Sequence, residues 1–445
     1  MRLAFVSPLP PAPTGIADYA ADVLELLSPG HEIDLFHAQE KVDAARLPAG
    51  AAVHPASELV ARHRQRPYDL AVYQMGNGRA HDFLYDLLSR VPGLLVLHDL
   101  VLHHARAAQF LESEAVRAWR EEPSSAAARE AARAPLDAWR AELEYSYPGR
   151  GERLFEAHLG TVGDLLPYAY PLFRVPVEAS RAVAVHNAYM AEAVRSEVPG
   201  TEVMCVPMPV TAAPVDPTTV RALRARLGWS SDEVVVGVFG LLTREKQVET
   251  VARAVARAAA QDQRVRLLLV GPVPDPGRLE ADLDRIGVHP LTVVTGRVPL
   301  SDLATHIEAA DVVAHLRYPS ARETSAALLR ALAQGRATVV SDLEHQAELP
   351  PDAVLRLDVT DEEGELTRAI LRLAGDPGAR ARLGAAASAH VRQAHTSSRV
   401  RDAWEDALER ARRLPDPPVR EWPAHWAAAS VDRATFQAPW SPAAW

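Results

Sequence analysis

Short runs of apolar residues alternate with longer segments of helical periodicity along most of the chain. Runs of four to eight apolar residues bounded by turn residues indicate buried strands, and apolar residues three or four positions apart indicate helices. This alternation is typical of doubly wound α/β domains. The predicted strands cover residues 3–6, 32–36, 70–73, 94–97, 181–187, 203–209, 234–240, 267–271, 292–298, 312–315 and 337–341.

Two interruptions of this pattern predict the domain organisation. Residues 105–170 have only helical periodicity, with a break at 123–125, and predict a helical insertion at about 105–175. A Pro-containing segment at 211–217 is the expected linker. The 445 residues are enough for two domains with full cores. We therefore expect a first domain at 1–210, a second at 218–395, and a last part at 396–445. That last part should hold a final helix and a tail that contains Trp422, Trp426, Trp440 and Trp445.

Residues 311–342 are the most informative stretch, because they predict a strand, a polar loop, a helix and a second strand. Thr324 and Ser325 are suited to cap the helix, and Gly335 to end it. Open α/β sheets bind anionic ligands where such a loop leads from the carboxyl end of a strand to a helix N-terminus. An ordinary strand–helix–strand crossover with a capped helix fits the same pattern.

This stretch resembles the signature of family 4 retaining glycosyltransferases. The helix end Leu-Arg-Ala-Leu-Ala-Gln-Gly at 329–335 and the strand Ala-Thr-Val-Val-Ser-Asp at 337–342 match the family pattern. The family's Gly-aromatic-Gly turn is replaced by Glu323-Thr324-Ser325, and the positions of its two Glu residues fall on Arg322 and Arg330. The sequence therefore resembles a variant branch of the family.

The resemblance implies the α/β fold called GT-B, with two Rossmann-like doubly wound domains that face a central cleft. It also implies transfer of a sugar from a nucleotide diphosphate sugar to a hydroxyl of a glycan or lipid-linked acceptor, with retention of configuration. Synthesis of a glycan, polysaccharide or glycolipid is the expected setting. Three alternatives stay open: a sugar-nucleotide epimerase of the same fold, a non-catalytic nucleotide-sugar-binding homologue, and an interaction scaffold that uses the Trp-rich tail.

In the second domain the resemblance assigns residues to the donor. Lys246 follows the strand end at Gly240 with the family's spacing and should hold the diphosphate; we expect this loop lysine to be solvated. The family has an arginine directly after this glycine, and Leu241 occupies that position here, so Arg244 or Arg317 is the candidate for the missing cation. The donor-binding candidates are Gly15, Gly240, Lys246, Val298, Arg317, Thr324, Ser325 and Arg330.

In the first domain, polar residues follow several predicted strands. His98, which precedes Asp99 at a strand end, resembles the family histidine that lies near the donor sugar. We assign it a catalytic role together with Glu323, whose carboxylate could orient sugar hydroxyls; a histidine bound only by its local backbone is the alternative. Asn77, Asp99 and His186 are the acceptor-side candidates.

The charge and the distribution of metal-ligating residues make several other classes of function less consistent with the sequence. The formal net charge of −10 argues against a general nucleic-acid binder. We expect no metal, because the one Asp-x-Asp pattern, at 282–284, lies in a helical segment, and because His103 and His104 are adjacent and point apart. No cofactor is expected, since the nucleotide diphosphate sugar is the donor substrate. The single cysteine, Cys205, and the absence of a signal peptide or of a long apolar run predict a cytoplasmic protein. Peripheral contact with the inner membrane face stays open, and the sequence does not indicate the oligomeric state.

Overall fold

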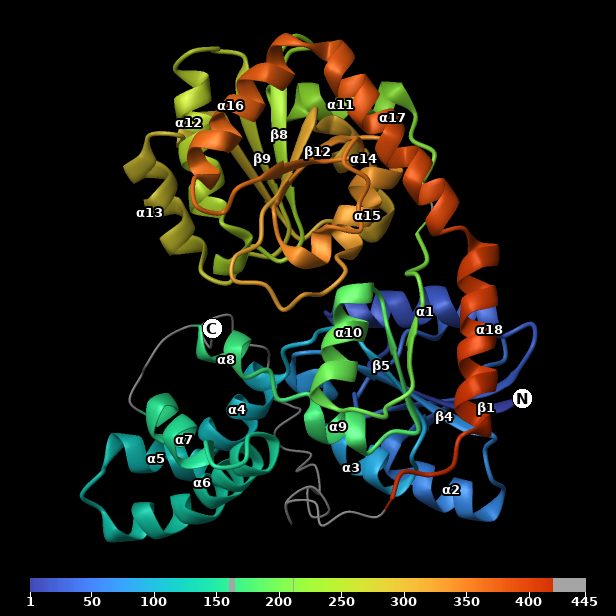
Figure 1. Cartoon of the computed structure of the whole chain (residues 1–445). Helices are drawn as coiled ribbons and strands as arrows, with labels where there is room; N and C mark the ends of the chain where they lie inside the picture. Colours follow the sequence, from blue (N-terminus) through green and yellow to red (C-terminus); the bar gives the residue numbers. More distant parts are fainter. Residues whose placement is uncertain (160–164, 211, 419–445) are drawn as a thin grey trace. The chain divides into compact units, whose positions relative to one another are not determined.

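The computed structural model describes residues 1–159, 165–210 and 212–418 (Figure 1). The four tryptophans of the predicted tail therefore lie outside the described residues. The chain forms two compact units. The first contains Met1–Met208, the short segment Ala321–Thr324 and residues 400–418, and the second contains Pro209–Ser320 and Ser325–Arg399.

The first unit is built on a seven-stranded sheet in which all neighbouring strands are parallel. The strand order is β3-β2-β1-β4-β5-β6-β7, so that β1 and β4 are neighbours from which the chain winds in opposite directions. β4, β5 and β6 are buried along their whole length, as expected for parallel strands covered on both faces. The strands are β1 (Arg2–Val6), β2 (Glu32–His37), β3 (Ala52–Pro55), β4 (Leu70–Met75), β5 (Leu94–Leu97), β6 (Ala182–Val185) and β7 (Val203–Cys205).

Helices connect these strands and begin at capping side chains. Thr14 accepts a hydrogen bond from the N–H of Ile16 at the start of α1, and Asn187 accepts one from the N–H of Met190 at the start of α10. The connecting elements are α1 (Gly15–Leu27), η1 (Ala44–Arg46), η2 (Ala56–Glu58), α2 (Leu59–Gln65), η3 (Arg79–His81), α3 (Phe83–Arg90), α9 (Arg174–Glu178) and α10 (Ala188–Glu197).

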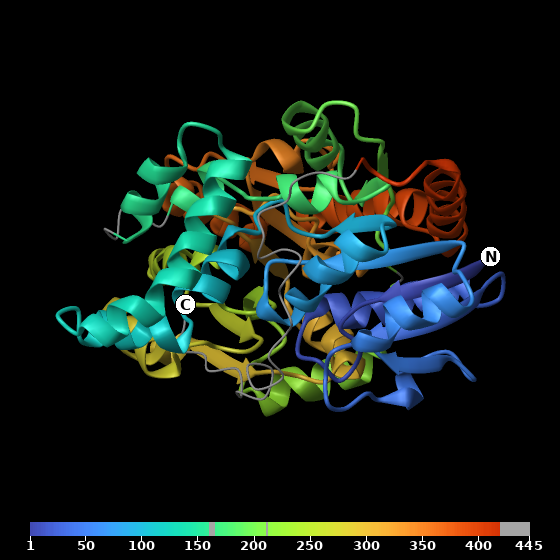
Figure 2. The same cartoon turned by 90° about the horizontal axis from the view of Figure 1, so that it is seen from below.

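Between β5 and α9 the chain forms a group of helices with an apolar core of its own around Trp139, which is fully buried. Figures 1 and 2 both show α5, α6 and α7 (teal) packed against one another. The predicted break at 123–125 falls between α5 and α6. The helices are α4 (His103–Leu111), α5 (Glu114–Glu121), α6 (Ala126–Ser146), α7 (Gly151–Leu159) and α8 (Leu166–Ala169).

A buried ion pair joins two of these helices to α3. The Arg106 guanidinium on α4 donates from Nε to Oε1 of Glu142 on α6 at 2.7 Å, and both side chains are almost completely buried. The same guanidinium lies 4.1 Å from the ring centre of Tyr85 on α3, as in a cation–π contact. α3, α4 and α6 therefore meet at one buried charge.

The last described helix, α18 (Ser397–Arg413), belongs to the first unit from Val400 on. Its Trp404 is fully buried, and Glu405 accepts from the imidazole of His31 at 2.9 Å. Arg401 donates to the carbonyl of Leu26 at 3.3 Å. These contacts join α18 to α1 and to the loop that follows it.

The second unit is built on a six-stranded parallel sheet of order β10-β9-β8-β11-β12-β13. Successive residues face opposite sides: Val236 and Leu267 pack with α12 and α16, and Val235 and Leu268 pack with α14 and α15. Figure 1 shows these two helix layers on either side of β8 and β9. The strands are β8 (Val234–Phe239), β9 (Val265–Val270), β10 (Thr292–Gly296), β11 (Val312–His315), β12 (Ala337–Ser341) and β13 (Leu355–Leu357). The helices are α11 (Pro217–Arg226), η4 (Arg244–Lys246), α12 (Val248–Ala259), α13 (Pro276–Ile286), η5 (His289–Leu291), α14 (Leu300–Ala309), α15 (Ala326–Ala333), η6 (Glu344–Gln346), α16 (Glu362–Gly375) and α17 (Pro377–Ala394).

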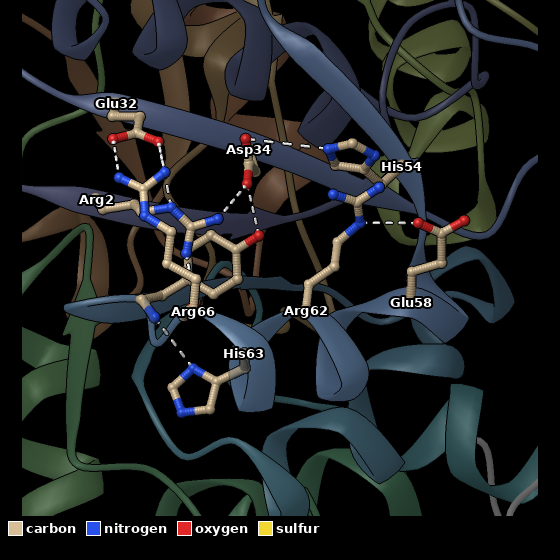
Figure 3. A network of polar contacts seen from close by, with 9 residues as sticks. Arg2, Glu32, Asp34, His54, Glu58, Arg62, His63 and Arg66 are labelled. Carbon is tan, nitrogen blue, oxygen red and sulfur yellow. Dashed lines mark hydrogen bonds and ion pairs between the residues drawn. The ribbon is translucent and has the colours of Figure 1, made fainter.

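Figure 3 shows a network of charged groups around the amino ends of β1 and β2. Arg2 donates to Glu32 and Asp34 at 3.2 and 2.9 Å, and its guanidinium lies 3.8 Å from the ring centre of Tyr68. The Tyr68 hydroxyl also donates to Asp34, at 2.6 Å. Because ligands of open α/β sheets bind at the opposite, carboxyl ends of the strands, we interpret this network as structural.

The structure contains two strands that the hydrophobic pattern does not predict. β3 and β13 are edge strands of three or four residues, and half or more of their residues are only partly buried. Short edge strands of this kind lack the continuous apolar run that marks a central parallel strand. In the part of the chain that the structure describes, no helix combines the length and the apolar character that crossing a membrane requires.

Candidate functional site

The topology of the second sheet places one group of candidate residues together. In chain order its strands are arranged 3-2-1-4-5-6, and the direction of winding reverses between β8 and β11. Ligands of such sheets bind outside the carboxyl ends of the strands at this switch point. Gly240 and Lys246 follow β8, and His315 and Arg317 lie at the end of β11 and just after it. The switch point therefore carries three groups that are cationic or can become so: Lys246, His315 and Arg317.

Lys246 lies within this group, but it is not the solvated loop residue that the sequence predicts. It is the last residue of η4 and only 4% exposed, and its ammonium group donates to the carbonyl of Phe239 at 2.6 Å. Gly240 has a φ of +100°, and a Cβ there would lie 3.2 Å from Nζ of Lys246. Glycine at 240 thus permits both this turn and the close approach of the ammonium group. The expectation of solvation is wrong because the turn folds back onto the end of β8.

The loop after β11 is fixed to β12 on one side and to the turn after β8 on the other. The backbone N–H of Arg317 donates to the hydroxyl of Ser341 on β12 at 2.9 Å. On the other side, Tyr318 donates to the carbonyl of Glu245 at 2.9 Å, and the side chain of Gln247 donates to the carbonyl of Tyr318 at 2.6 Å. These bonds hold the Arg317 backbone beside the turn that carries Lys246.

A buried carboxylic group supports this loop from beneath. The hydroxyl of Ser341 donates to Glu362 at the start of α16, and both residues are buried. Burial raises the pKa of the Glu362 carboxyl, and the hydrogen bond from Ser341 partly opposes that rise. Glu362 therefore orients the hydroxyl that binds Arg317.

Two further histidines, 315 and 345, line the same place, although the sequence does not single them out. Burial lowers the pKa of His315 well below its usual value, and the neighbouring charges of Lys246, Arg317 and His345 lower it further. His315 is therefore neutral at pH 7. His345 is buried, and its Nε2 lies 3.1 Å from the side-chain nitrogen of Gln346.

The predicted turn at 323–325 is divided between the two units. Ser325 caps α15, since its hydroxyl accepts from the N–H of Leu328 at 3.4 Å, and it belongs to the second unit. Arg322, Glu323 and Thr324 belong to the first unit. There the side chain of Asn187 donates to the carbonyl of Arg322 at 2.9 Å and to the hydroxyl of Thr324 at 3.1 Å. Arg322 has a φ of +62°, which is unfavourable for a residue with a side chain and often marks a functional segment.

The two remaining donor candidates of the second unit lie at other positions. Arg330 lies in the second turn of α15, and its carbonyl accepts from the N–H of Gln334. Val298 lies two residues after β10 and packs, partly buried, against the core on one face of the sheet. Only the backbone of Val298 is therefore suited to meet a polar ligand.

The first sheet has its own switch point between β1 and β4. Gly15 opens α1 in the loop after β1, and a Cβ at this position would meet no other atom within 4 Å. At Gly76, just after β4, a Cβ would lie 2.2 Å from the side chain of Ile16 and 3.1 Å from that of His81. The absence of a side chain at 76 allows α1 and the loop after β4 to approach closely.

Three histidines gather beside this point. His98 directly follows β5, and its Nδ1 lies 3.3 Å from Nε2 of His186, which directly follows β6. Nε2 of His98 lies 2.8 Å from the side chain of Gln74 on β4, and Nδ1 of His81 donates to the Gln74 carbonyl at 2.9 Å. The ring of Tyr19 packs edge-on against His98, with 4.6 Å between ring centres. His98 thus has partners on both ring nitrogens, and it is 6% exposed.

Two other acceptor-side candidates also meet. The backbone N–H of Asn77 donates to the Asp99 carboxylate at 2.8 Å, and the Asn77 side chain accepts from the N–H of Ala105 at 3.0 Å. Asn77 therefore joins the loop after β4 to the start of the helical group. His103 is separate from His98: its Nδ1 donates to the carbonyl of Tyr170, and its Nε2 lies 3.2 Å from Nδ1 of His158.

The carboxyl part of the chain matches a known family. Residues 233–376, about a third of the chain, match the family model described as "Glycosyl transferases group 1". This range includes the whole switch point of the second sheet. None of the curated proteins matches the sequence.

Several solved structures resemble the chain over almost its whole length. Sucrose-phosphate synthase from Thermosynechococcus elongatus aligns with a TM-score of 0.62 at 18% identity, over 92% of this chain and 98% of that one. HepE from Anabaena in complex with UDP-glucose aligns with a TM-score of 0.62 at 16% identity, over 92% and 100%. WaaG, a glycosyltransferase involved in lipopolysaccharide biosynthesis, aligns with a TM-score of 0.58 at 14% identity, over 92% and 99%. The predicted GT-B fold, with two parallel-sheet α/β units, is confirmed.

Proposed function

We propose that this protein is a glycosyltransferase that moves a sugar from a nucleotide diphosphate sugar to an acceptor hydroxyl with retention of configuration. The observation that carries the proposal is the position of Lys246 and Arg317 at the switch point of the second sheet, inside the region that matches the family model. The proposal includes an acceptor hydroxyl that belongs to a glycan, a polysaccharide or a glycolipid. It also includes peripheral contact with a membrane.

The chemical problem in this reaction is the negative charge that develops on the departing diphosphate. The switch point offers the ammonium group of Lys246 and the guanidinium of Arg317 to stabilise it, and the N-terminus of α15 offers backbone N–H groups nearby. Cations and N–H groups fixed before the reaction lose no energy in reorganising when the charge appears. Glu323 and His98 are the groups assigned to the sugar.

The bound ligands of one structural neighbour agree with this donor class. The HepE structures hold UDP, UDP-glucose, or UDP with glucose. In the present chain the nucleotide should bind to the second unit, with its diphosphate at Lys246 and its base near the backbone of Val298.

A second candidate is a binding protein that takes the same nucleotide sugar without transferring it. The observation in its favour is that Leu241, Arg322 and Arg330 replace an arginine and two glutamates of the resembled family. A nucleotide-sugar epimerase is the third, and turnover of the donor without any acceptor would identify it.

The test is a thermal-shift screen of the full chain against nucleoside diphosphates and their sugars, followed by incubation of the stabilising donor with oligosaccharide and glycolipid acceptors. A ligand present at a hundred times its Kd should stabilise the protein by about 2.7 kcal/mol. The expected product carries the donor's anomeric configuration, as read from the proton NMR coupling of the new linkage. Binding without transfer or hydrolysis would favour the second candidate, and no stabilisation by any nucleotide would refute both.

A further inference from the structure

The buried side chains of Gln74, His98 and His186 form one continuous hydrogen-bonded chain that ends at a backbone carbonyl. It runs from the side-chain amide of Gln74 to Nε2 of His98 at 2.8 Å, from Nδ1 of His98 to Nε2 of His186 at 3.3 Å, and from Nδ1 of His186 to the carbonyl of Val206 at 2.8 Å. Gln74, His98 and His186 come from the ends of the adjacent strands β4, β5 and β6.

The direction of the chain is set at its fixed end. A backbone carbonyl can only accept, so Nδ1 of His186 must carry the proton that is bound to Val206. A neutral imidazole with its proton on Nδ1 has a lone pair on Nε2. Because His186 is buried, we take its imidazole as neutral; its Nε2 then accepts, and Nδ1 of His98 is the donor.

His98 is neutral as well. Its side chain is buried, and burial lowers its pKa well below the usual value, with smaller contributions from His186 and His81. With its one proton on Nδ1, His98 has a lone pair on Nε2. That nitrogen needs a donor rather than an acceptor.

Gln74 can supply that donor. With the carboxamide oxygen toward His98, the Gln74 nitrogen has no hydrogen-bond partner among the described residues. The oxygen and nitrogen of an amide are distinguished only by their hydrogen bonds, and exchanging them leaves the side chain in place. The exchanged amide donates to the lone pair of His98, and the whole chain then has one consistent direction.

We infer that His186 and Gln74 are positioning residues that hold His98 as the neutral imidazole with its proton on Nδ1. The ring of Tyr19 packs against the rings of His98 and His186, with 4.6 and 5.0 Å between ring centres, and holds the two imidazoles in their relative orientation. The consequence for the reaction, which rests on the proposed function, is that His98 cannot give a proton to a leaving group. It acts on the sugar only as a hydrogen-bond acceptor at Nε2, for a donor hydroxyl that takes the place of Gln74.

The test is nitrogen NMR of the full chain labelled with ¹⁵N-histidine at pH 7.5, in which two-bond couplings show which ring nitrogen carries the proton. His98 is assigned by comparison with His98→Gln. The expected state is a proton on Nδ1. His186→Phe keeps the ring but removes the acceptor, so the form with the proton on Nε2 should become the majority. His186→Gln retains an oxygen near the position of Nε2 and should restore the original form.

His81→Phe is the matched control, because it removes another buried ring beside Gln74 that does not contact the nitrogens of His98. It should leave the His98 proton on Nδ1, and thermal melts verify that each variant is folded. A proton on Nε2 in the wild type, a doubly protonated His98, or no change in His186→Phe would overturn the inference. These readouts need no activity, so failure of the proposed transfer reaction would leave the tautomer result standing, and the reverse also holds.

Discussion

Replacing Lys246 by methionine tests the proposed diphosphate site most directly. Methionine fills a similar volume without the charge, so the substitution removes the ammonium group and leaves the η4 turn occupied. The buried position of Lys246 makes this choice better than alanine, which would add a cavity.

The expected loss of affinity follows from one charge-assisted hydrogen bond, which contributes about 1.5–3 kcal/mol. The Lys246→Met variant should therefore bind the nucleoside diphosphate about 10- to 150-fold more weakly. The free energy of unfolding should change less than the free energy of binding, because two effects oppose each other. The carbonyl of Phe239 loses its partner, at a cost of about 1–3 kcal/mol, whereas removal of a buried charge beside Arg317 acts in the opposite direction.

The assay is calorimetric titration with the diphosphate identified by the screen and with its bare nucleoside. Among 48 basic residues the chain has only two lysines, and the other, Lys41, is exposed in the first unit. Lys41→Met is thus a matched control that changes the net charge equally and should bind as the wild type does. The nucleoside should bind all three proteins alike.

Equal diphosphate affinity in Lys246→Met and wild type would refute the reasoning. The leaving-group role would then pass to Arg244, Arg317 or Arg322. An equal loss for diphosphate and nucleoside would instead show that the substitution disturbs the whole site.

Three other properties can be checked independently. Sugar transfer should persist in excess chelator, because the Asp282-Leu283-Asp284 pattern lies on α13 rather than at a strand end; activity that disappears and returns with magnesium would contradict this. Acid should destabilise the fold, since burial lowers the pKa of His81 from 6.5 to about 4. As the pH falls, His81 of the unfolded chain binds a proton before His81 of the folded chain does, so the free energy of unfolding decreases between pH 6.5 and about pH 4, by about 2 kcal/mol at pH 5. Denaturant titrations of His81→Gln should show a smaller decrease. Glu142→Gln, which leaves Arg106 buried without its counter-charge, should cost about 3–5 kcal/mol in denaturant unfolding, whereas Glu130→Gln on the exposed face of α6 should stay within about 0.5 kcal/mol.

The central strands could be predicted from the sequence because each is a continuous apolar run. The capped start of α15 at Ser325 and the helical character of the Asp282–Asp284 pattern could also be predicted, since both depend on neighbours within a few residues. The edge strands β3 and β13 could not, because pairing with the sheet, rather than their own composition, makes them strands.

The environment of the candidate site could be predicted only in part. The spacing from Gly240 pointed to Lys246, but its burial depends on the end of β8 and on a loop about 70 residues away. The contact between His98 and His186 joins residues 88 positions apart. One signal was available, because Gln74, His98 and His186 all lie at the ends of successive predicted strands, and in a parallel sheet those ends share one edge.

The path of the chain through α18 has a consequence for biogenesis. The helix whose Trp404 completes the core of the first unit is synthesised after Pro209–Ser320 and Ser325–Arg399, which form the second unit. Domains usually fold in the order in which they emerge, amino-terminal first. Here the amino-terminal unit must wait, with the surface of α1 that later receives α18 uncovered, while the second unit can already be complete. A released chain that ends near residue 396 would therefore contain nearly all of the second unit but lack α18, so the unit made first would be the one left incomplete.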